Sequence, residues 1–290
     1  MTALRDTSWI ERQYKDLRYA PESVAQCLDL YLPNDGAPPY PVIVAIHGGG
    51  FVFGDKQEDQ LNAPVAAVAE GFAVAAINYR MRDEAVFPAA VRDAKAAVRY
   101  LRGHAARFGL DADRFAAWGN SAGGYFAVML GVTADSSEFD DPDGAELVSA
   151  RVQAVVDWFG PVDFLAIDAQ FTRSGKAPAN RSGPDSVESQ FLGVALAKAD
   201  PDLLRRANPL TYLVPGMPPF LIQHGAEDDV VPVEQSLLLA ERLRPFLEPR
   251  DLRLNILAGV QHGGPAFETP ENMARVFKFL KIHLAQEKMR

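Results

Sequence analysis

The sequence is poor in cysteine and in positive charge, and it contains no long hydrophobic run. Its single cysteine, Cys27, cannot form an internal disulfide and is typical of a reducing compartment. No stretch approaches the roughly 18 apolar residues that span a membrane, and residues 1–6 lack the apolar core of a signal peptide. The net charge of −9 disfavours nucleic acid and anionic membranes as partners. We therefore expect a soluble, cytoplasmic protein.

The overall composition is that of a folded globular chain. Hydrophobic residues make up 48% of the 290 residues and charged residues 23%. Apolar runs and helically spaced segments alternate, which predicts a mostly parallel sheet covered on both faces. Residues 1–14 have the composition of a short polar lead-in, and we expect a single domain over 1–290. Strands are predicted at 24–32, 42–46, 72–77, 114–118, 152–156, 219–223 and 251–257, and helices at 88–107, 124–130, 232–247 and 271–284.

The most informative motif is the glycine-rich stretch G-N-S-A-G at residues 119–123. An apolar run that suits a buried strand precedes it, and a segment that suits a helix follows it. This context predicts a sharp strand-to-helix turn that presents the hydroxyl of Ser121 above the edge of the sheet. Glycines are needed there because a Cβ would collide with the neighbouring backbone.

A second glycine-rich turn, H-G-G-G at residues 47–50, follows another apolar run. Such a loop can point its backbone N–H groups at developing negative charge. Both turns lie at the carboxyl ends of predicted strands, where sites form in parallel sheets. Together the two turns predict a serine hydrolase.

A serine nucleophile needs a general base, and the base needs an orienting carboxylate. Where a serine occupies such a turn, the acid and then the histidine follow it along the chain. His262 is the histidine that follows a plausible acid and lies in a loop directly after a strand, so it is the predicted base. The other four occupy less suitable places: His47, His104, His224 and His283.

The predicted acid lies in the loop that follows residue 223. Glu227, Asp228 and Asp229 all compete for this role. An acidic residue that orients an imidazolium must have a short side chain whose carboxylate is held in a fixed position. Spacing alone does not choose among these neighbours.

The chain resembles the α/β-hydrolase superfamily, in particular the hormone-sensitive-lipase-like esterases and the bacterial feruloyl/acetyl esterase-like group. The resemblance covers nearly the whole chain. It is carried by 28–33 (L-D-L-Y-L-P), 47–51 (H-G-G-G-F), 78–80 (N-Y-R), 87–93 (F-P-A-A-V-R-D), 119–123, 158–161 (W-F-G-P) and 224–232 (H-G-A-E-D-D-V-V-P).

The resemblance implies an α/β-hydrolase fold with a mostly parallel, eight-stranded sheet, helices on both faces and a lid insertion. The family pattern H-G-x-x-D-x-x-V-P places the acid at Asp228, with Asp229 as the rival. It also implies an oxyanion hole formed by the backbone N–H groups of Gly49, Gly50 and Ala122. Aromatic candidates for the substrate pocket are Phe51, Trp158 and Phe159.

Residues 162–212 break the alternation of strands and helices, since they are rich in serine, glycine, proline and charge. A structureless loop of this length is unusual in a compact domain unless it serves a site. We predict a lid with short helices; a disordered surface excursion is the alternative. Lipase-like relatives carry a longer N-terminal cap, so the lid here must come mainly from 162–212.

These observations predict a carboxylic ester hydrolase that acts through an acyl-enzyme on short, water-soluble esters. No metal and no organic cofactor is expected. The expected partner is a small-molecule ester, and homodimerisation is left open. An amide hydrolase, such as an arylformamidase or a small peptidase, would use the same triad. A non-catalytic binding module on a hydrolase fold is the second alternative, although such modules usually lose a triad residue.

Overall fold

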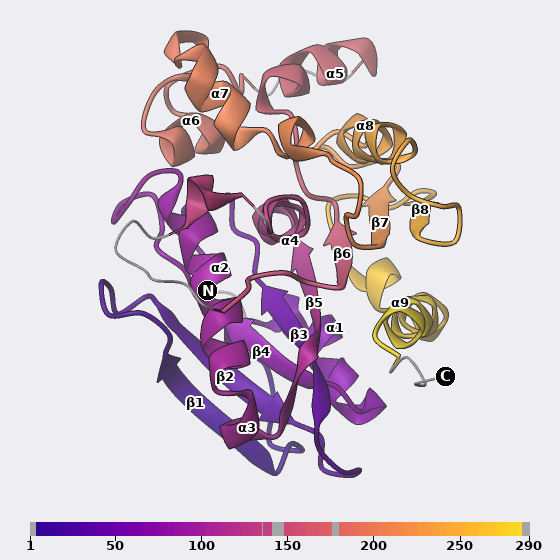
Figure 1. Cartoon of the computed structure of the whole chain (residues 1–290). Helices are drawn as coiled ribbons and strands as arrows, with labels where there is room; N and C mark the ends of the chain where they lie inside the picture. Colours follow the sequence, from indigo (N-terminus) through magenta and orange to yellow (C-terminus); the bar gives the residue numbers. More distant parts are fainter. Residues whose placement is uncertain (1–3, 135, 141–147, 176–179, 286–290) are drawn as a thin grey trace.

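One eight-stranded sheet forms the centre of the protein. The computed structural model describes residues 4–134, 136–140, 148–175 and 180–285. The strand order is β1-β2-β4-β3-β5-β6-β7-β8, with antiparallel pairing of β1 to β2 and of β2 to β4 and parallel pairing elsewhere (Figure 1). The strands are β1 Arg12–Arg18, β2 Cys27–Leu32, β3 Tyr40–Ile46, β4 Ala73–Ile77, β5 Leu110–Asn120, β6 Ala154–Trp158, β7 Phe220–Gly225 and β8 Leu252–Leu257.

Helices cover both faces of the sheet, and each face has its own hydrophobic core. The larger core joins the sheet to α2, α3, α4 and α8, and the smaller one joins it to α1 and α9. The α-helices of the described residues are α1 Asn62–Ala66, α2 Ala89–Gly103, α3 Ala105–Phe108, α4 Ala122–Val132, α5 Ile167–Arg173, α6 Val187–Leu192, α7 Pro201–Ala207, α8 Glu234–Leu243 and α9 Pro270–His283. The predicted fold class is confirmed.

The central strands are continuous apolar runs because both of their faces are covered. The N-terminal edge differs from the prediction in two ways. The strand expected over 24–32 begins only at Cys27, and Val24 is 81% exposed in the preceding turn. β1 begins within the segment that was predicted to be a polar lead-in. The sequence did not indicate this strand, because R-Q-Y-K-D-L-R shows no apolar alternation. This edge strand forms because β2 offers it a partner.

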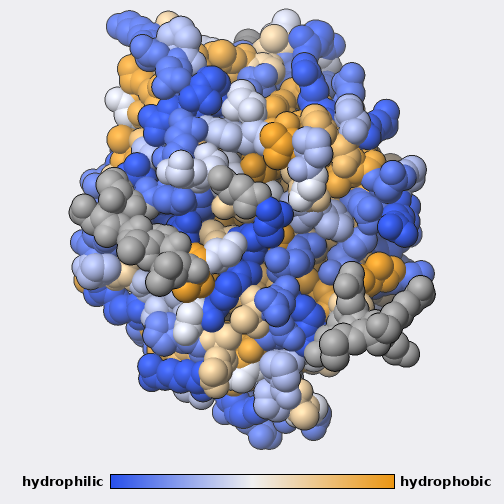
Figure 2. All heavy atoms as spheres, in the orientation of Figure 1, coloured by the Kyte–Doolittle hydropathy of each residue, from blue (hydrophilic) through white to orange (hydrophobic). Residues whose placement is uncertain are grey.

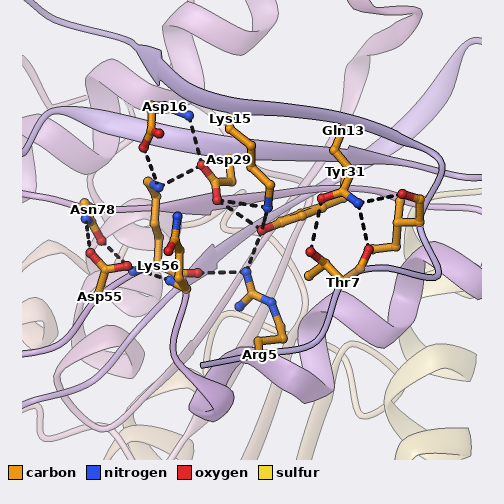
Figure 3. A network of polar contacts seen from close by, with 12 residues as sticks. Arg5, Thr7, Gln13, Lys15, Asp16, Asp29, Tyr31, Asp55, Lys56 and Asn78 are labelled. Carbon is orange, nitrogen blue, oxygen red and sulfur yellow. Dashed lines mark hydrogen bonds and ion pairs between the residues drawn. The ribbon is translucent and has the colours of Figure 1, made fainter. Parts of the chain in front are cut away.

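A buried polar network fastens the N-terminal segment to the loop that follows the H-G-G-G turn (Figure 3). Lys56 Nζ lies 2.7 Å from Asp29 Oδ1, and Arg5 donates to the Tyr31 hydroxyl and to the Lys56 carbonyl, both at 2.8 Å. Burial acts against both charges, yet hydrogen bonds and opposite charge hold the pKa of Asp29 below its usual value and that of Lys56 above it. The segment around Arg5 is therefore tied into the fold.

The cap segment, residues 162–212, lies between β6 and β7. Its helices α5, α6 and α7 gather at one end of the molecule, at the top of Figure 1. The short helices predicted there are confirmed in its described part, while 176–179 lie outside the described residues. The cap is not a separate layer, because Phe164, Phe171 and Phe191 are buried in the larger core. Its role as a lid stays a prediction.

Hydrophilic side chains cover most of the face seen in Figure 2, and hydrophobic ones form separate groups among them. Within the described part of the chain, no helix combines the length and the apolar character needed to cross a bilayer.

Candidate active site

Ser121 lies in the predicted turn between β5 and α4. Its backbone has φ 55° and ψ −123°, a conformation that is costly for any residue with a Cβ. The flanking glycines make the turn feasible. A Cβ on Gly119 would lie 2.0 Å from the Gly123 carbonyl oxygen, and one on Gly123 would lie 2.0 Å from the Ile46 oxygen. The strand–turn–helix prediction is confirmed.

His262 and Asp228 complete a chain of contacts that begins at this serine. His262 Nε2 lies 3.0 Å from Ser121 Oγ, and His262 Nδ1 lies 2.7 Å from Asp228 Oδ2. Nδ1 faces a carboxylate and therefore carries the proton, which leaves Nε2 free to accept the serine proton. Burial acts to raise the pKa of Asp228, but hydrogen bonds from His224 and His262 hold it well below its usual value.

The structure distinguishes the three acidic candidates. Asp228 is fully buried, whereas Glu227 and Asp229 are exposed. The second oxygen of Asp228, Oδ1, accepts the backbone N–H groups of Val230 and Val231, both at 2.8 Å. Its carboxylate is thus fixed on both sides, as an orienting acid must be.

The glycine loop and the start of α4 present backbone N–H groups beside Ser121. Gly49 and Gly50 have positive φ values of 111° and 57°, and among the described residues neither N–H has an acceptor. Ala122 opens α4, where the first N–H groups lack partners within the helix. All three residues line one cavity together with Ser121 and His262.

Two side chains shape this loop. The buried His47 ring stacks on Tyr79 with centroids 4.6 Å apart, and its Nδ1 lies 2.7 Å from the Gly48 carbonyl. Gln60 Oε1 accepts the Gly48 N–H at 2.8 Å and the Asn120 amide at 3.2 Å. Gln60 thereby joins the glycine loop to the serine turn. Sequence reasoning missed it, because position 60 belongs to no motif.

The three aromatic candidates all reach the wall of the cavity, which holds about 640 Å³. Phe51 stacks on Phe191 of the cap at 4.2 Å. Phe159 meets the His262 ring edge-on at 4.7 Å. Phe51, Trp158 and Phe159 are each at most 4% exposed, so they belong to the core as well as to the wall.

The cap contributes a further part of the wall. Val187 lies over Gly50, where an added Cβ would be 3.2 Å from Val187 Cγ1. Arg181 Nη1 pairs with the buried Glu188 at 3.1 Å, and Arg181 Nη2 donates to the Val230 carbonyl at 2.7 Å. The cap is therefore tied directly to the loop that carries Asp228.

Asp157 is a buried carboxyl group near the serine turn that the sequence analysis did not identify. Its Oδ1 accepts the Gly160 N–H at 3.0 Å, and among the described residues its buried Oδ2 has no hydrogen-bond partner. Burial raises the pKa of Asp157 to about 7, with the Gly160 bond opposing the shift. Near neutral pH this side chain changes its charge inside the core.

We expect Asp157→Asn to become increasingly stabilising as the pH rises. Between an unfolded pKa of about 3.9 and the folded value of about 7, the folded chain binds a proton that the unfolded chain has released. Wild-type stability therefore falls as the pH rises through this window, by up to about 1.4 kcal/mol per unit. Asparagine mimics the neutral acid at every pH. Urea unfolding at pH 5 and pH 7 should show the variant gaining about 2 to 3 kcal/mol over wild type.

The exposed Asp83→Asn is the matched control and should show no such pH-dependent gain. A free-energy difference between Asp157→Asn and wild type that is the same at both pH values would contradict the expectation.

Known proteins share this architecture. The sequence profile of the BD-FAE family matches residues 28–243, which is most of the chain. Esterase LipC of Mycobacterium tuberculosis is 29% identical over 264 residues, covering 90% of this chain and 62% of LipC. The chain thus spans less than two thirds of that relative.

Solved structures agree over almost the whole chain. A truncated form of a carbohydrate esterase from gut microbiota is similar with a TM-score of 0.83 and 26% identity, covering 98% of this chain and 100% of that one. An acetyl ester-xyloside bifunctional hydrolase from Caldicellulosiruptor lactoaceticus has a TM-score of 0.69 and 25% identity, covering 88% of each chain. The protein adopts the α/β-hydrolase fold and belongs to the BD-FAE family.

Proposed function

We propose that this protein is a serine carboxylic ester hydrolase that acts on short, water-soluble acyl esters through an acyl-enzyme. The observation that carries the proposal is the unbroken contact chain from Ser121 through His262 to Asp228. It opens into a cavity that is also lined by Gly49 and Gly50, whose backbone N–H groups have no acceptor among the described residues. Esterase names among the relatives support the same reaction.

In the proposed acylation step, Ser121 Oγ attacks the ester carbonyl while His262 Nε2 takes the hydroxyl proton. Asp228 holds the imidazole in the required tautomer and stabilises the imidazolium that forms. The N–H groups of Gly49, Gly50 and Ala122 stabilise the negative charge on the carbonyl oxygen, and loss of one such donor typically costs about 3 kcal/mol. His262 then donates its proton to the leaving alcohol.

Deacylation uses the same groups, with water in place of the serine hydroxyl as the nucleophile. Water attacks the acyl carbonyl with His262 as the general base, and the oxyanion again lies against the glycine loop and Ala122. Collapse of this intermediate returns the proton to Ser121 Oγ and releases the acid. Every proton transfer passes through His262 Nε2.

The cavity has an aromatic wall and a polar wall, which suggests different surroundings for the two halves of an ester. Phe51 and Phe159 form the aromatic part, and Glu58, Gln60 and Glu268 form the polar part. We infer that the acyl half is small and that the alcohol half carries hydrogen-bonding groups. Structural neighbours named for carbohydrate esters and for an acetyl ester-xyloside support this inference.

The surface of the cap does not favour lipids as substrates. A lipase lid needs a broad apolar face that binds an interface. In the described part of the cap, Leu165 is the only large hydrophobic side chain that is more than a third exposed. We therefore propose that the enzyme acts on dissolved ester without interfacial activation.

An initial-rate panel tests the substrate class. It compares the p-nitrophenyl esters of acetate, butyrate, octanoate and laurate with a feruloyl ester and an aryl formamide, and uses Ser121→Ala as the blank. We expect the highest kcat/KM on acetate or butyrate and a rate that saturates below the solubility limit. Faster turnover of laurate, or a jump in rate when an emulsion forms, would indicate a lipase. Preference for the formamide would indicate an amide hydrolase.

A further inference from the structure

His224 lies against the buried carboxylate of Asp228 and is itself shielded from solvent. It lies at the end of β7, four residues before Asp228, and is fully buried. Its Nε2 lies 3.1 Å from Asp228 Oδ2 and 2.9 Å from the Val231 carbonyl oxygen. Its Nδ1 lies 2.7 Å from Ser236 Oγ on α8. Both ring nitrogens thus have polar partners in the core.

The partners of the ring determine its tautomer. Nε2 faces two oxygens that can only accept, the Asp228 carboxylate and the Val231 carbonyl. It must therefore carry a proton. Ser236 Oγ can donate as well as accept, so its hydroxyl satisfies Nδ1 of a neutral ring. A neutral His224 with its proton on Nε2 meets every hydrogen-bonding requirement of this pocket.

Asp228 Oδ2 consequently lies beside two imidazole nitrogens that carry a proton, and it shares the Nε2–H group of His224 with the Val231 carbonyl. His262 Nδ1 approaches it at 2.7 Å from the active-site side, and His224 Nε2 approaches it at 3.1 Å from the core. Each added donor stabilises the ionised carboxylate and restricts its rotation. A second donor also weakens the electrostatic attraction between the Asp228 carboxylate and His262.

We propose that His224 is a positioning residue of the active site, which fixes the Asp228 carboxylate and moderates its pull on His262. The proposal rests on the proposed esterase function. His224 itself does not line the cavity that holds Ser121, so it acts through Asp228 and does not contact substrate. Within the described part of the chain, its hydrogen-bond and ring partners other than Asp228 are neutral: Ser236, the Val231 carbonyl and the Phe159 ring.

Two conservative variants separate the two ends of the ring. His224→Gln places an amide nitrogen near the position of Nε2 and keeps a donor to Asp228. His224→Asn places one near the position of Nδ1, so it keeps a partner for Ser236 and loses the donor to Asp228. Both leave a polar side chain of similar character in the same pocket. Thermal unfolding shows whether each variant is folded.

For His224→Asn we expect kcat to fall about 10- to 100-fold, the loss typically seen when the orienting partner of a metal-binding side chain is removed, with KM within about twofold. The acid limb of the kcat/KM profile should move to higher pH, because a carboxylate with one fewer donor attracts protonated His262 more strongly. His224→Gln should restore the wild-type limb and most of kcat. Wild-type kcat and profile in His224→Asn, or equal losses in both variants without a shift of the limb, would overturn the proposal.

The wild-type protein provides a test that needs no variant. In ¹⁵N-histidine NMR spectra at pH 7.5, His224 should be neutral with its proton on Nε2, and the reverse tautomer would overturn the proposal. Ser236→Ala removes the partner of Nδ1 alone, so we expect it to change kcat less than His224→Asn does. If wild type and Ser121→Ala hydrolyse esters equally, the proposed function fails, whereas a failure confined to the His224 variants leaves it intact.

Discussion

Replacing Ser121 with alanine is expected to lower ester turnover by about 10⁵- to 10⁶-fold, the scale typical of a lost serine nucleophile. The alanine side chain has no atom that can form the acyl bond. The fold should survive, because among the described residues the hydroxyl has a hydrogen bond to His262 at the open cavity and to no other side chain or backbone group. Steady-state rates on a short p-nitrophenyl ester, together with thermal unfolding, measure both effects.

A fluorophosphonate probe provides the matching chemical test. It should label the wild-type protein once, at Ser121, and should not label the alanine variant. Retention of wild-type rates by Ser121→Ala, or labelling of another residue, would exclude the acyl-enzyme mechanism proposed for this cavity.

Asp228→Asn is expected to lower kcat by about 10⁴-fold, as in the template triad. An asparagine amide can turn a donor toward His262 Nδ1, which favours a proton on Nε2 and removes the base that Ser121 needs. The two N–H groups of Val230 and Val231 would still hold the asparagine oxygen, so the loop should keep its shape. Rates at saturating substrate measure the loss.

Asp229→Asn is the matched control, since this neighbouring carboxylate is exposed. We expect it to retain most of the activity. A larger loss from Asp229→Asn than from Asp228→Asn would mean that the acid has been assigned one residue too early in the chain.

The serine turn and the glycine loop could be predicted from the sequence, because glycine is required where the neighbouring backbone leaves no room for a Cβ. Gly119 and Gly123 stand where a Cβ would meet a carbonyl oxygen at 2.0 Å, so the pattern and the geometry have the same cause. The central strands could also be predicted, since full burial on both faces requires continuous apolar runs. Asp228, in contrast, was selected by resemblance, and its burial now supplies a physical reason.

What the sequence could not indicate depends on contacts between distant parts of the chain. β1 has the pattern of an exposed polar segment and is a strand only through its pairing with β2. Gln60 bridges Gly48 and Asn120, which no spacing in the sequence reveals. The 16% exposed Arg181 side chain reaches the Val230 carbonyl across 49 residues. Such partners are set by tertiary packing.

The burial of the cap in the larger core affects how a substrate enters the active-site cavity. The side chains that the cap buries in that core include Phe164, Ile167, Phe171, Phe191 and Leu192. Each fully buried side chain of this kind contributes about 1.5–3 kcal/mol, so swinging the segment away would cost on the order of 10 kcal/mol. We expect the entrance to have a fixed width, which screens esters by size before any chemistry occurs. Transplanting a relative's cap should change that screening only where the graft keeps these five side chains.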